Sequence, residues 1–286
     1  MSSRFEKYCR NKTEAAIAAH LPGFATVEAP REPPPGMVAI GNDWSRRLFD
    51  GWFYRTEPVA ARQVPALSLV FVQSADGNTG ADDPITLGGG ETDKHLLYEG
   101  LSRVDADAVL AGAATAASAD IVFSVWHPEL VRLRTGNGCS RHPAQLIVTE
   151  SGNLPIDTAL MYAEPSLRVL VITGPAGAAR LAPRLSGRSW VEIIDAGQPV
   201  DLRSALRALY ARGMRVISAI GGRRTADALL RAGSVAEIYL TTSGRPGGEP
   251  GTPFSSAPIP PHRVLVEKRG LGEESGVRFQ HLLLEP

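Results

Sequence analysis

The sequence predicts an α/β fold in which helices cover both faces of a largely parallel sheet. Between residues 67 and 242, short apolar runs of strand length alternate with amphipathic helical patterns, which is typical of βαβ units. The chain has 286 residues and is 43% apolar, which is enough for a substantial core. Two later apolar runs, 264–267 and 277–283, are expected to add an antiparallel hairpin at the edge of the sheet.

Each expected strand is an apolar run bounded by polar or glycine-rich residues. In chain order these runs are 67–72, 106–110, 146–149, 168–173, 190–194, 215–220 and 238–242. The clearest helix starts at Asp201 and can end at Gly213, with its leucines on one face. Thr92 and Asp93 are expected to cap another helix, which carries the leucines from residue 96 onward.

Residues 1–64 differ from the rest of the chain. A short helical pattern is followed by prolines at positions 30 and 33–35, which break regular structure, and then by an aromatic cluster around Phe53. About 60 residues without a disulfide or a metal form a marginal core on their own. We therefore expect residues 1–64 to be an arm that packs on the main domain, residues 65–286, or on a partner subunit.

Charge and cysteine content exclude several classes of protein. Lysine plus arginine number 30 and aspartate plus glutamate number 30, so the net charge gives no global attraction to nucleic acid or to an anionic membrane. The first residues lack a signal peptide, and no apolar run approaches the ~20 residues of a membrane span. Cys9 and Cys139 cannot form a four-thiolate zinc site. We expect a cytoplasmic protein whose partner is a small molecule.

The most informative segment is an apolar run that ends in Gly221 and Gly222, where a helical pattern begins at once. Glycines let backbone N–H groups approach an anion closely, and the helix dipole favours negative charge at that end. Arg223 and Thr225 add donors in the first turn, where the oxygens of a pyrophosphate would lie. Taken alone, the glycine pair is equally well explained as a tight turn without a ligand.

Further polar or small residues follow other expected strands. Gly112 and Thr115 lie in a small-residue turn, and Thr149 and Ser151 supply hydroxyls that suit the adenosine phosphate of a dinucleotide. Asp76 follows the first strand, at the edge where open α/β sheets bind ligands. Each segment also has an ordinary interpretation as a turn, above all the Asp-Gly pair at Asp76.

Two isolated side chains, His127 and Arg134, are further candidates for binding a substrate phosphate. A lone histidine more often has a structural role, and an arginine of this kind is commonly a surface charge. The sequence contains no Gly-x-Ser-x-Gly elbow and no His-x-x-x-His spacing. A proton donor is not evident from the sequence, and solvent can serve.

Taken together, these segments resemble the reductase domain of riboflavin biosynthesis over roughly residues 65–284. The order and spacing of the motifs carry the likeness, since no single one is specific. The matching segments are Ser74-Ala75-Asp76-Gly77, Ala106 to Leu110, the turn from Gly112 to Thr115, the turn from Ser151 to Pro155, and Leu229-Leu230-Arg231-Ala232-Gly233 after the glycine pair. The resemblance implies a dihydrofolate reductase-like fold with three α/β/α layers and a C-terminal antiparallel hairpin.

The resemblance also implies an activity: NADPH-dependent reduction of the ribosyl group of a 5-phosphoribosylamino-pyrimidine to the ribityl amine by hydride transfer. It implies a homodimer. Two isolated cysteines cannot supply the zinc deaminase domain of bifunctional members, which predicts a stand-alone reductase. The implied cofactor-binding residues are Gly112, Thr115, Thr149, Ser151, Gly221, Gly222, Arg223 and Thr225. The implied catalytic residue is Asp76, with Asn78, His127 and Arg134 as further contacts of the substrate.

Three departures from the family pattern lie where the family binds its substrate. Ile220 precedes the glycine pair where riboflavin reductases carry glutamate, Asn78 replaces a lysine, and Asp120 alone stands near the missing Asp-Asp-Pro segment. Isoleucine before the glycines is the dihydrofolate reductase form, so a dihydrofolate- or pterin-type reductase is an alternative. A nucleotide-binding module without catalysis is another. A Rossmann dehydrogenase is disfavoured because no Gly-x-Gly-x-x-Gly follows the first strand.

Overall fold

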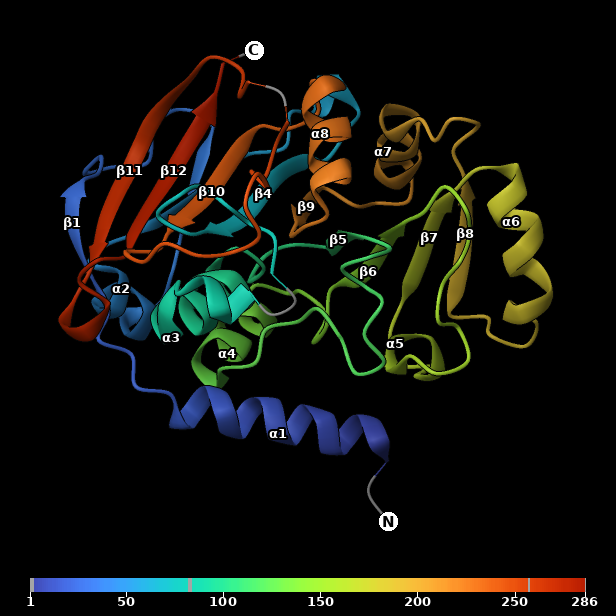
Figure 1. Cartoon of the computed structure of the whole chain (residues 1–286), viewed down its shortest axis with the longest axis horizontal. Coiled ribbons are helices and arrows are strands. Elements are labelled where there is room, and N and C mark those ends of the chain that lie inside the picture. The colour runs from blue at the N-terminus through green and yellow to red at the C-terminus, as the bar shows by residue number, and fades with distance from the viewer. Residues whose placement is uncertain (1–2, 82–83, 257, 286) are drawn as a thin grey trace.

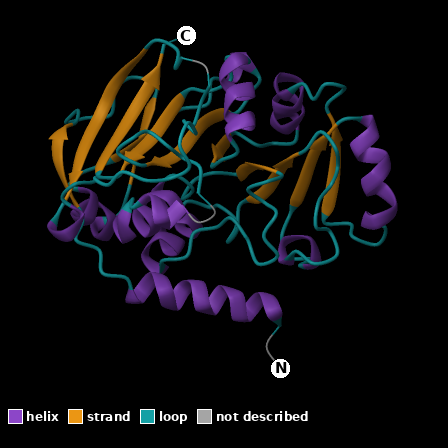
Figure 2. Ribbon diagram, in the orientation of Figure 1, coloured by secondary structure: helices purple, strands orange, loops and turns teal. Residues whose placement is uncertain are grey.

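The computed structural model describes residues 3–81, 84–256 and 258–285. Within these residues, a twisted ten-stranded sheet has the order β1-β11-β12-β10-β4-β9-β5-β6-β7-β8 (Figures 1 and 2). The strands are β1 (Phe24–Glu28), β4 (Ala66–Gln73), β5 (Ala108–Gly112), β6 (Ala144–Val148), β7 (Val169–Thr173), β8 (Val191–Asp195), β9 (Val216–Ala219), β10 (Glu237–Thr242), β11 (His262–Gly270) and β12 (Arg278–Leu284). A separate two-stranded sheet pairs β2 (Met37–Ile40) with β3 (Phe53–Thr56).

The α/β fold and its mostly parallel sheet are confirmed. The strands from β10 to β8 in the sheet order all pair in parallel, whereas β12 is antiparallel to β10 and to β11. The expected C-terminal hairpin is therefore present. It does not form the edge, because β1 from the N-terminal segment pairs antiparallel with β11 outside it.

Helices cover both faces of the sheet. The longer ones are α1 (Arg4–Ala18), α2 (Asp43–Phe49), the π-helix η3 (Asp93–Leu101), α4 (Pro128–Gly136), α6 (Pro175–Leu181), α7 (Leu202–Ala211) and α8 (Arg223–Arg231). Shorter helical turns are η1 (Ala60–Arg62), η2 (Pro84–Leu87), α3 (Gly90–Thr92), α5 (Leu160–Ala163), η4 (Ala182–Leu185) and η5 (Gly272–Glu274). None of the described helices is long and apolar enough to cross a membrane.

The side chains of the central strands alternate between two apolar layers, as the period of a strand requires. In β5, Val109 packs in one layer and Leu110 in the other. The helices α7 and α8 contribute leucines to the layer that contains Leu110, and α1, α2, η3, α4, α5 and α6 contribute to the opposite layer. The three-layer arrangement follows from this division.

The helix expected to start at a Thr92–Asp93 cap begins earlier than the sequence indicated. The short helix α3 starts at Gly90 and continues directly into η3, so Thr92 and Asp93 lie inside helical turns and are buried. That expectation was wrong. Burial of two side chains that usually favour exposed caps suggests that tertiary contacts determine this segment.

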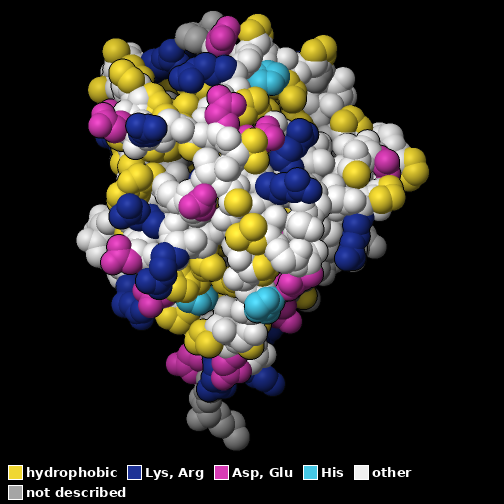
Figure 3. Space-filling model, turned by 90° about the vertical axis from the view of Figure 1, so that its left-hand side faces the viewer, with side chains coloured by type: hydrophobic (Ala, Val, Ile, Leu, Met, Phe, Trp, Pro, Cys, Tyr) yellow, Lys and Arg dark blue, Asp and Glu magenta, His cyan; other side chains and the backbone are white. Residues whose placement is uncertain are grey.

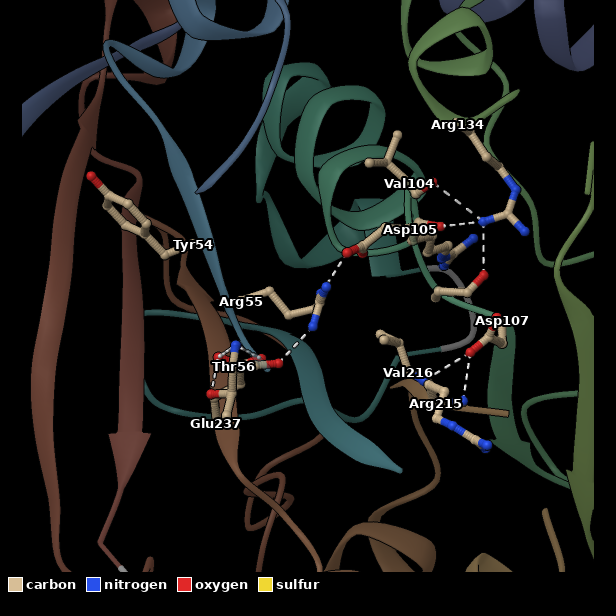
Figure 4. Close-up of polar contacts among 12 residues, drawn as sticks. Tyr54, Arg55, Thr56, Val104, Asp105, Asp107, Arg134, Arg215, Val216 and Glu237 are labelled. Atoms are coloured by element: carbon tan, nitrogen blue, oxygen red, sulfur yellow. Dashed lines mark hydrogen bonds and ion pairs between the residues drawn. The ribbon is translucent and has the colours of Figure 1, made fainter. Parts of the chain in front are cut away.

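The N-terminal segment packs on the rest of the chain, which was one of the two arrangements expected. The ring of Phe53 on β3 lies 4.6 Å from that of Tyr239 and 6.2 Å from that of Phe279. Polar contacts reinforce this packing (Figure 4): Thr56 donates from its amide and its hydroxyl to the buried Glu237 carboxylate, and Arg55 pairs with Asp105.

The outer face that Figure 3 shows, on the β1 side, carries interspersed basic and acidic side chains.

Phe53→Ala should lower the free energy of unfolding by about 3–5 kcal/mol, because Phe53 is only 2% exposed and its removal leaves a cavity among aromatic rings. Val59→Ala is the matched control within the same segment, since Val59 is 49% exposed and should change stability by no more than about 0.5 kcal/mol. Urea denaturation of the two variants measures both values. Equal effects of the two substitutions would contradict the packing described here.

Candidate active site

A cleft of about 1710 Å³ lies along the carboxyl ends of the central parallel strands. Its floor includes Val72 near the end of β4, Gly112 at the end of β5, Val148 at the end of β6 and Ile220 just after β9. Ligands of open α/β sheets bind at this edge, because the loops that leave the strands diverge there. The cleft is therefore the candidate active site.

The ends of β5 and β9 approach each other closely, and glycines allow it. Gly112 donates its amide to the carbonyl of Gly221 at 3.3 Å, and a Cβ atom on Gly112 would lie 2.8 Å from Thr225 Oγ1. Gly222 has φ +83°, a conformation that favours glycine, and no side chain of the described residues caps the N-terminus of α8 that it begins. The result is a cradle of backbone groups with helical amides directed to the cleft, which suits a diphosphate.

The structure brings all of the predicted cofactor-binding residues to this one cleft. Those that line it are Gly112, Thr115, Thr149, Ser151, Gly221, Gly222, Arg223 and Thr225. They come from loops after three different strands, so only the folded chain assembles them. Beside Ser151, the guanidinium of Arg180 donates to the Ser151 carbonyl at 2.9 Å and adds positive charge to this end of the cleft.

Asp76 and Asn78 do not line the cleft. Instead they tie the loop after β4 to the loop after β10, because Gly247 donates its amide to Asp76 Oδ2 at 3.2 Å and Asn78 donates to the Gly247 carbonyl at 3.1 Å. Asn78 also accepts a hydrogen bond from the amide of Thr252 at 3.3 Å. Both loops contribute other residues to the wall of the cleft. Asp76 and Asn78 thus position that wall, and Asp76 is exposed.

His127 and Arg134 also lie outside the cleft, and both are engaged elsewhere. The His127 ring stacks on Trp44 with a centroid distance of 4.0 Å, and its Nδ1 accepts from the amide of Glu129 at the start of α4. Arg134 is buried and donates to the carbonyls of Arg103, Ala106 and Ser140. Figure 4 shows its guanidinium beside Val104, whose carbonyl it also contacts. These contacts hold the amino end of β5, at the opposite edge of the sheet. We do not retain His127 and Arg134 as substrate contacts.

Sequence reasoning missed Asp93, which lines the cleft from the first turn of η3 and is only 4% exposed. Among the described residues, only Thr241 donates a hydrogen bond to its carboxyl group, at Oδ1. The pKa of Asp93 is raised to about 7, mainly by burial; the Thr241 hydroxyl opposes this shift, and the nearby Glu274 carboxylate adds to it. A carboxyl group that exchanges its proton near neutrality is suited to acid–base chemistry.

Sequence reasoning also missed a basic group at the other end of η3. Arg103 lines the cleft, is 1% exposed, and has its guanidinium 4.6 Å from the centre of the Tyr98 ring. The Tyr98 hydroxyl in turn donates to the carbonyl of Ile220 at 3.2 Å, which connects Arg103 to the glycine cradle. The helix α1 adds Tyr8 and Lys12 to the same wall.

Comparison with known proteins relates this chain to a family of reductases. The model of the RibD C-terminal domain matches residues 65–269. No curated protein matches the sequence of this chain. Among solved structures, a pyrimidine reductase-like protein of Corynebacterium diphtheriae is 22% identical, with a TM-score of 0.63 over 78% of this chain and 92% of that one.

Two other structures share the fold at lower identity. A diaminohydroxyphosphoribosylaminopyrimidine deaminase/5-amino-6-(5-phosphoribosylamino)uracil reductase of Thermotoga maritima is 18% identical, with a TM-score of 0.57; the match covers 79% of this chain and 58% of that protein. A riboflavin biosynthesis reductase of Saccharomyces cerevisiae is 18% identical, with a TM-score of 0.53, over 78% and 91% of the two chains. At these identities the likeness establishes the fold.

The matched family region takes in the carboxyl ends of β4, β5, β6 and β9, the helix α8, and the glycine cradle between them. The resemblance to the reductase domain of riboflavin biosynthesis is thereby confirmed, and it supports an oxidoreductase. On the extent of this match, the chain belongs to the RibD C-terminal domain family.

Proposed function

We propose that this chain is an NADPH-dependent reductase that converts the ribosyl group of a 5-phosphoribosylamino-pyrimidine into a ribityl group. Family membership supports reductase chemistry. The main support for a dinucleotide cofactor is the glycine cradle at the N-terminus of α8, where no side chain blocks the helical amides. The uracil reductase activity in the name of the Thermotoga relative supports the substrate class. In this proposal, residues 65–286 form the reductase domain and residues 1–64 an extension of it.

The residues of the cleft fit a nicotinamide dinucleotide. Gly112, Gly221 and Gly222 would let its diphosphate reach the amides at the start of α8, where Arg223 and Thr225 add donors. Thr115 lies against Gly221 from the facing loop. At the end of β6, Thr149 and Ser151 would hold the adenosine phosphate, with the charge of Arg180 beside them. When bound, the dinucleotide supplies the hydride.

Reduction of the opened imine form of the substrate needs a proton for the nitrogen as well as a hydride for the carbon. We propose Asp93 as the holder of that proton, in place of Asp76, which is exposed and outside the cleft. Thr241 occupies Oδ1 of Asp93, so Oδ2 would present the proton to the substrate. With a pKa of about 7, the carboxyl group is partly protonated at neutral pH and can be reloaded from solvent.

The dihydrofolate- or pterin-type alternative could use Asp93 as its proton donor too. A pterin is also reduced at a C=N bond, and Ile220 beside the cradle departs from the riboflavin reductase pattern. The two proposals predict different substrates for the same acid. Initial rates of NADPH oxidation with 5-amino-6-(5-phosphoribosylamino)uracil and with dihydrofolate separate them. Binding of NADPH without turnover of either substrate would instead support a binding module without catalysis.

Gly222→Ala should weaken NADPH binding by about tenfold or more, because a side chain at φ +83° strains the cradle where the diphosphate would approach. Gly213→Ala is the matched control: Gly213 has φ +88° but lies after α7, with open space around it. It should show a similar backbone strain without a loss of affinity. Isothermal titration calorimetry with NADPH measures both, and equal affinities would contradict the assigned cradle.

Asp93→Asn should lower kcat by about 10²–10⁴-fold while NADPH binding is retained, because the amide cannot deliver the proton. In the wild-type protein, kcat should fall as the pH rises through about 7, since the acid form of Asp93 is then lost. The Thr241 hydrogen bond lowers this pKa, so Thr241→Val should move the fall to higher pH. The measurements are pH–rate profiles together with an NMR titration of the Asp93 carboxyl carbon. A titration midpoint near 4 would contradict this role.

A further inference from the structure

We infer that Glu274, in the turn η5 between β11 and β12, is a positioning residue for Asp93: it holds the helical turn that carries the acid and places a second carboxylate behind it. The inference rests on the proposed function, in which Asp93 delivers a proton. It gives a role to a residue that lies beyond residues 65–269, the part of the chain that the family model matches, and that does not line the cleft.

The first observation is that Glu274 takes the place of a helix cap. Gly89 precedes α3 and has no side chain that could cap it. Instead, Glu274 Oε1 accepts a hydrogen bond from the amide of Thr92 at 3.2 Å, in the first turn of this helix. A carboxylate is stabilising near the free amides of a helix N-terminus. Because Asp93 is the next residue, Glu274 fixes the turn from which the acid enters the cleft.

The second observation is that glycines at the start of α3 let both carboxyl groups come close. Gly90 has φ +87°, and a Cβ atom on it would lie 2.4 Å from Glu274 Oε1. A Cβ atom on Gly89 would lie 3.0 Å from Asp93 Oδ2. The two carboxyl groups therefore lie against consecutive glycines, and a side chain at position 90 would force the Glu274 carboxylate away.

Neighbouring segments hold Glu274 in place. Its amide donates to the carbonyl of Leu271 at 3.0 Å, and its carbonyl accepts from the amide of Val277 at 2.8 Å. From the N-terminal segment, Gly23 donates its amide to the Thr92 hydroxyl at 3.3 Å and accepts from the Leu271 amide at 3.0 Å. The turn, the N-terminal segment and the helix are thus joined, which gives the Glu274 carboxylate a fixed position relative to the helix.

The third observation is that the hydrogen bond to Thr92 does not need the charge of Glu274. The residue is only 8% exposed, and its Oε2 has no hydrogen-bond partner among the described residues. A neutral amide side chain would accept the same bond without the cost of burying a charge near another carboxyl group. What only the charge provides is electrostatic: it disfavours the ionised form of Asp93 and adds to the rise in pKa that burial causes.

Other ionisable groups belong to the elements around Asp93. They are Glu91, Lys94, His95 and Tyr98 on its own helix, Arg245 on the loop after β10, and Arg269 and Glu273 on the strand and turn near Glu274. Glu91 is paired with Lys94 at 3.7 Å and with His95 at 3.0 Å. Burial raises the pKa of Tyr98, which keeps it neutral. The charge that raises the pKa of Asp93 is that of Glu274.

The test removes the charge of Glu274 and keeps an oxygen for the Thr92 amide. In Glu274→Gln, the NMR titration midpoint of the Asp93 carboxyl carbon should fall from about 7 by about one pH unit, because like-charge repulsion is lost. The value of kcat should then fall about tenfold at pH 8 but less than about twofold at pH 5, where Asp93 stays protonated. Glu273→Gln is the matched control, since the Glu273 side chain is 65% exposed on the same turn. It should change neither quantity.

The wild-type protein offers a second measurement that needs no variant. The carboxyl carbon of Glu274 should change its chemical shift as Asp93 ionises near pH 7, and that of Glu273 should not. Three results would overturn the inference: no such response, a midpoint that stays near 7 in Glu274→Gln, or an equal loss of kcat at pH 5 and pH 8, which indicates a purely structural role. If the protein reduces neither the pyrimidine nor dihydrofolate, the proposed function fails, whereas the NMR titrations need no substrate and still decide whether Glu274 acts on Asp93.

Discussion

The close approach of β5 and β9 is the constraint on which the site depends. These two strands pair in the centre of the sheet, and their carboxyl ends converge where no Cβ atom can be accommodated between Gly112 and the first turn of α8. That absence of side chains exposes helical amides to a cleft instead of burying them under a cap. The neighbouring strands β4 and β6 then determine how far the cleft extends on either side. In the proposed function, backbone amides would bind the phosphates of the cofactor, which would leave side chains of the cleft for substrate recognition.

Local patterns in the sequence predicted the strands of the sheet and the glycine cradle, because each of these features is formed by residues that are neighbours in the sequence. The strands of the α/β layer are apolar runs, α7 shows its buried face as leucines at helical spacing, and the glycine pair lies directly between β9 and α8. Parallel strands place their carboxyl ends at one edge, so the predicted cofactor-binding residues that follow β5, β6 and β9 were expected together and all line the cleft, whereas Asp76 and Asn78 after β4 do not. The edge strand β1 was not predicted, since its partner β11 is more than 230 residues away in the sequence.

Asp93 and the basic side chains that line the cleft escaped prediction because long-range contacts place them there. Asp93 has the sequence context of a helix cap, and only the hydrogen bond from Thr241, 148 residues later, and its burial give it a different character. Lys12 belongs to a segment expected to be only an arm, and it lines the cleft through its contact with Glu99, 87 residues away. Conversely, His127 and Arg134 were attractive by residue type alone. The fold uses one as a cap and stacking partner and the other to bind carbonyls at the far edge of the sheet.

The hydrogen bonds of Asp76 and Asn78 give the cleft a mechanical property. They join the loops that leave two adjacent parallel strands, β4 and β10, and a further bond runs from the Glu249 amide to the Gly80 carbonyl. The two loops are therefore coupled, and displacement of one requires displacement of the other. A ligand that contacts either loop therefore meets a single wall made of both, because Asp76 and Asn78 bind the backbone of Gly247 on the other loop.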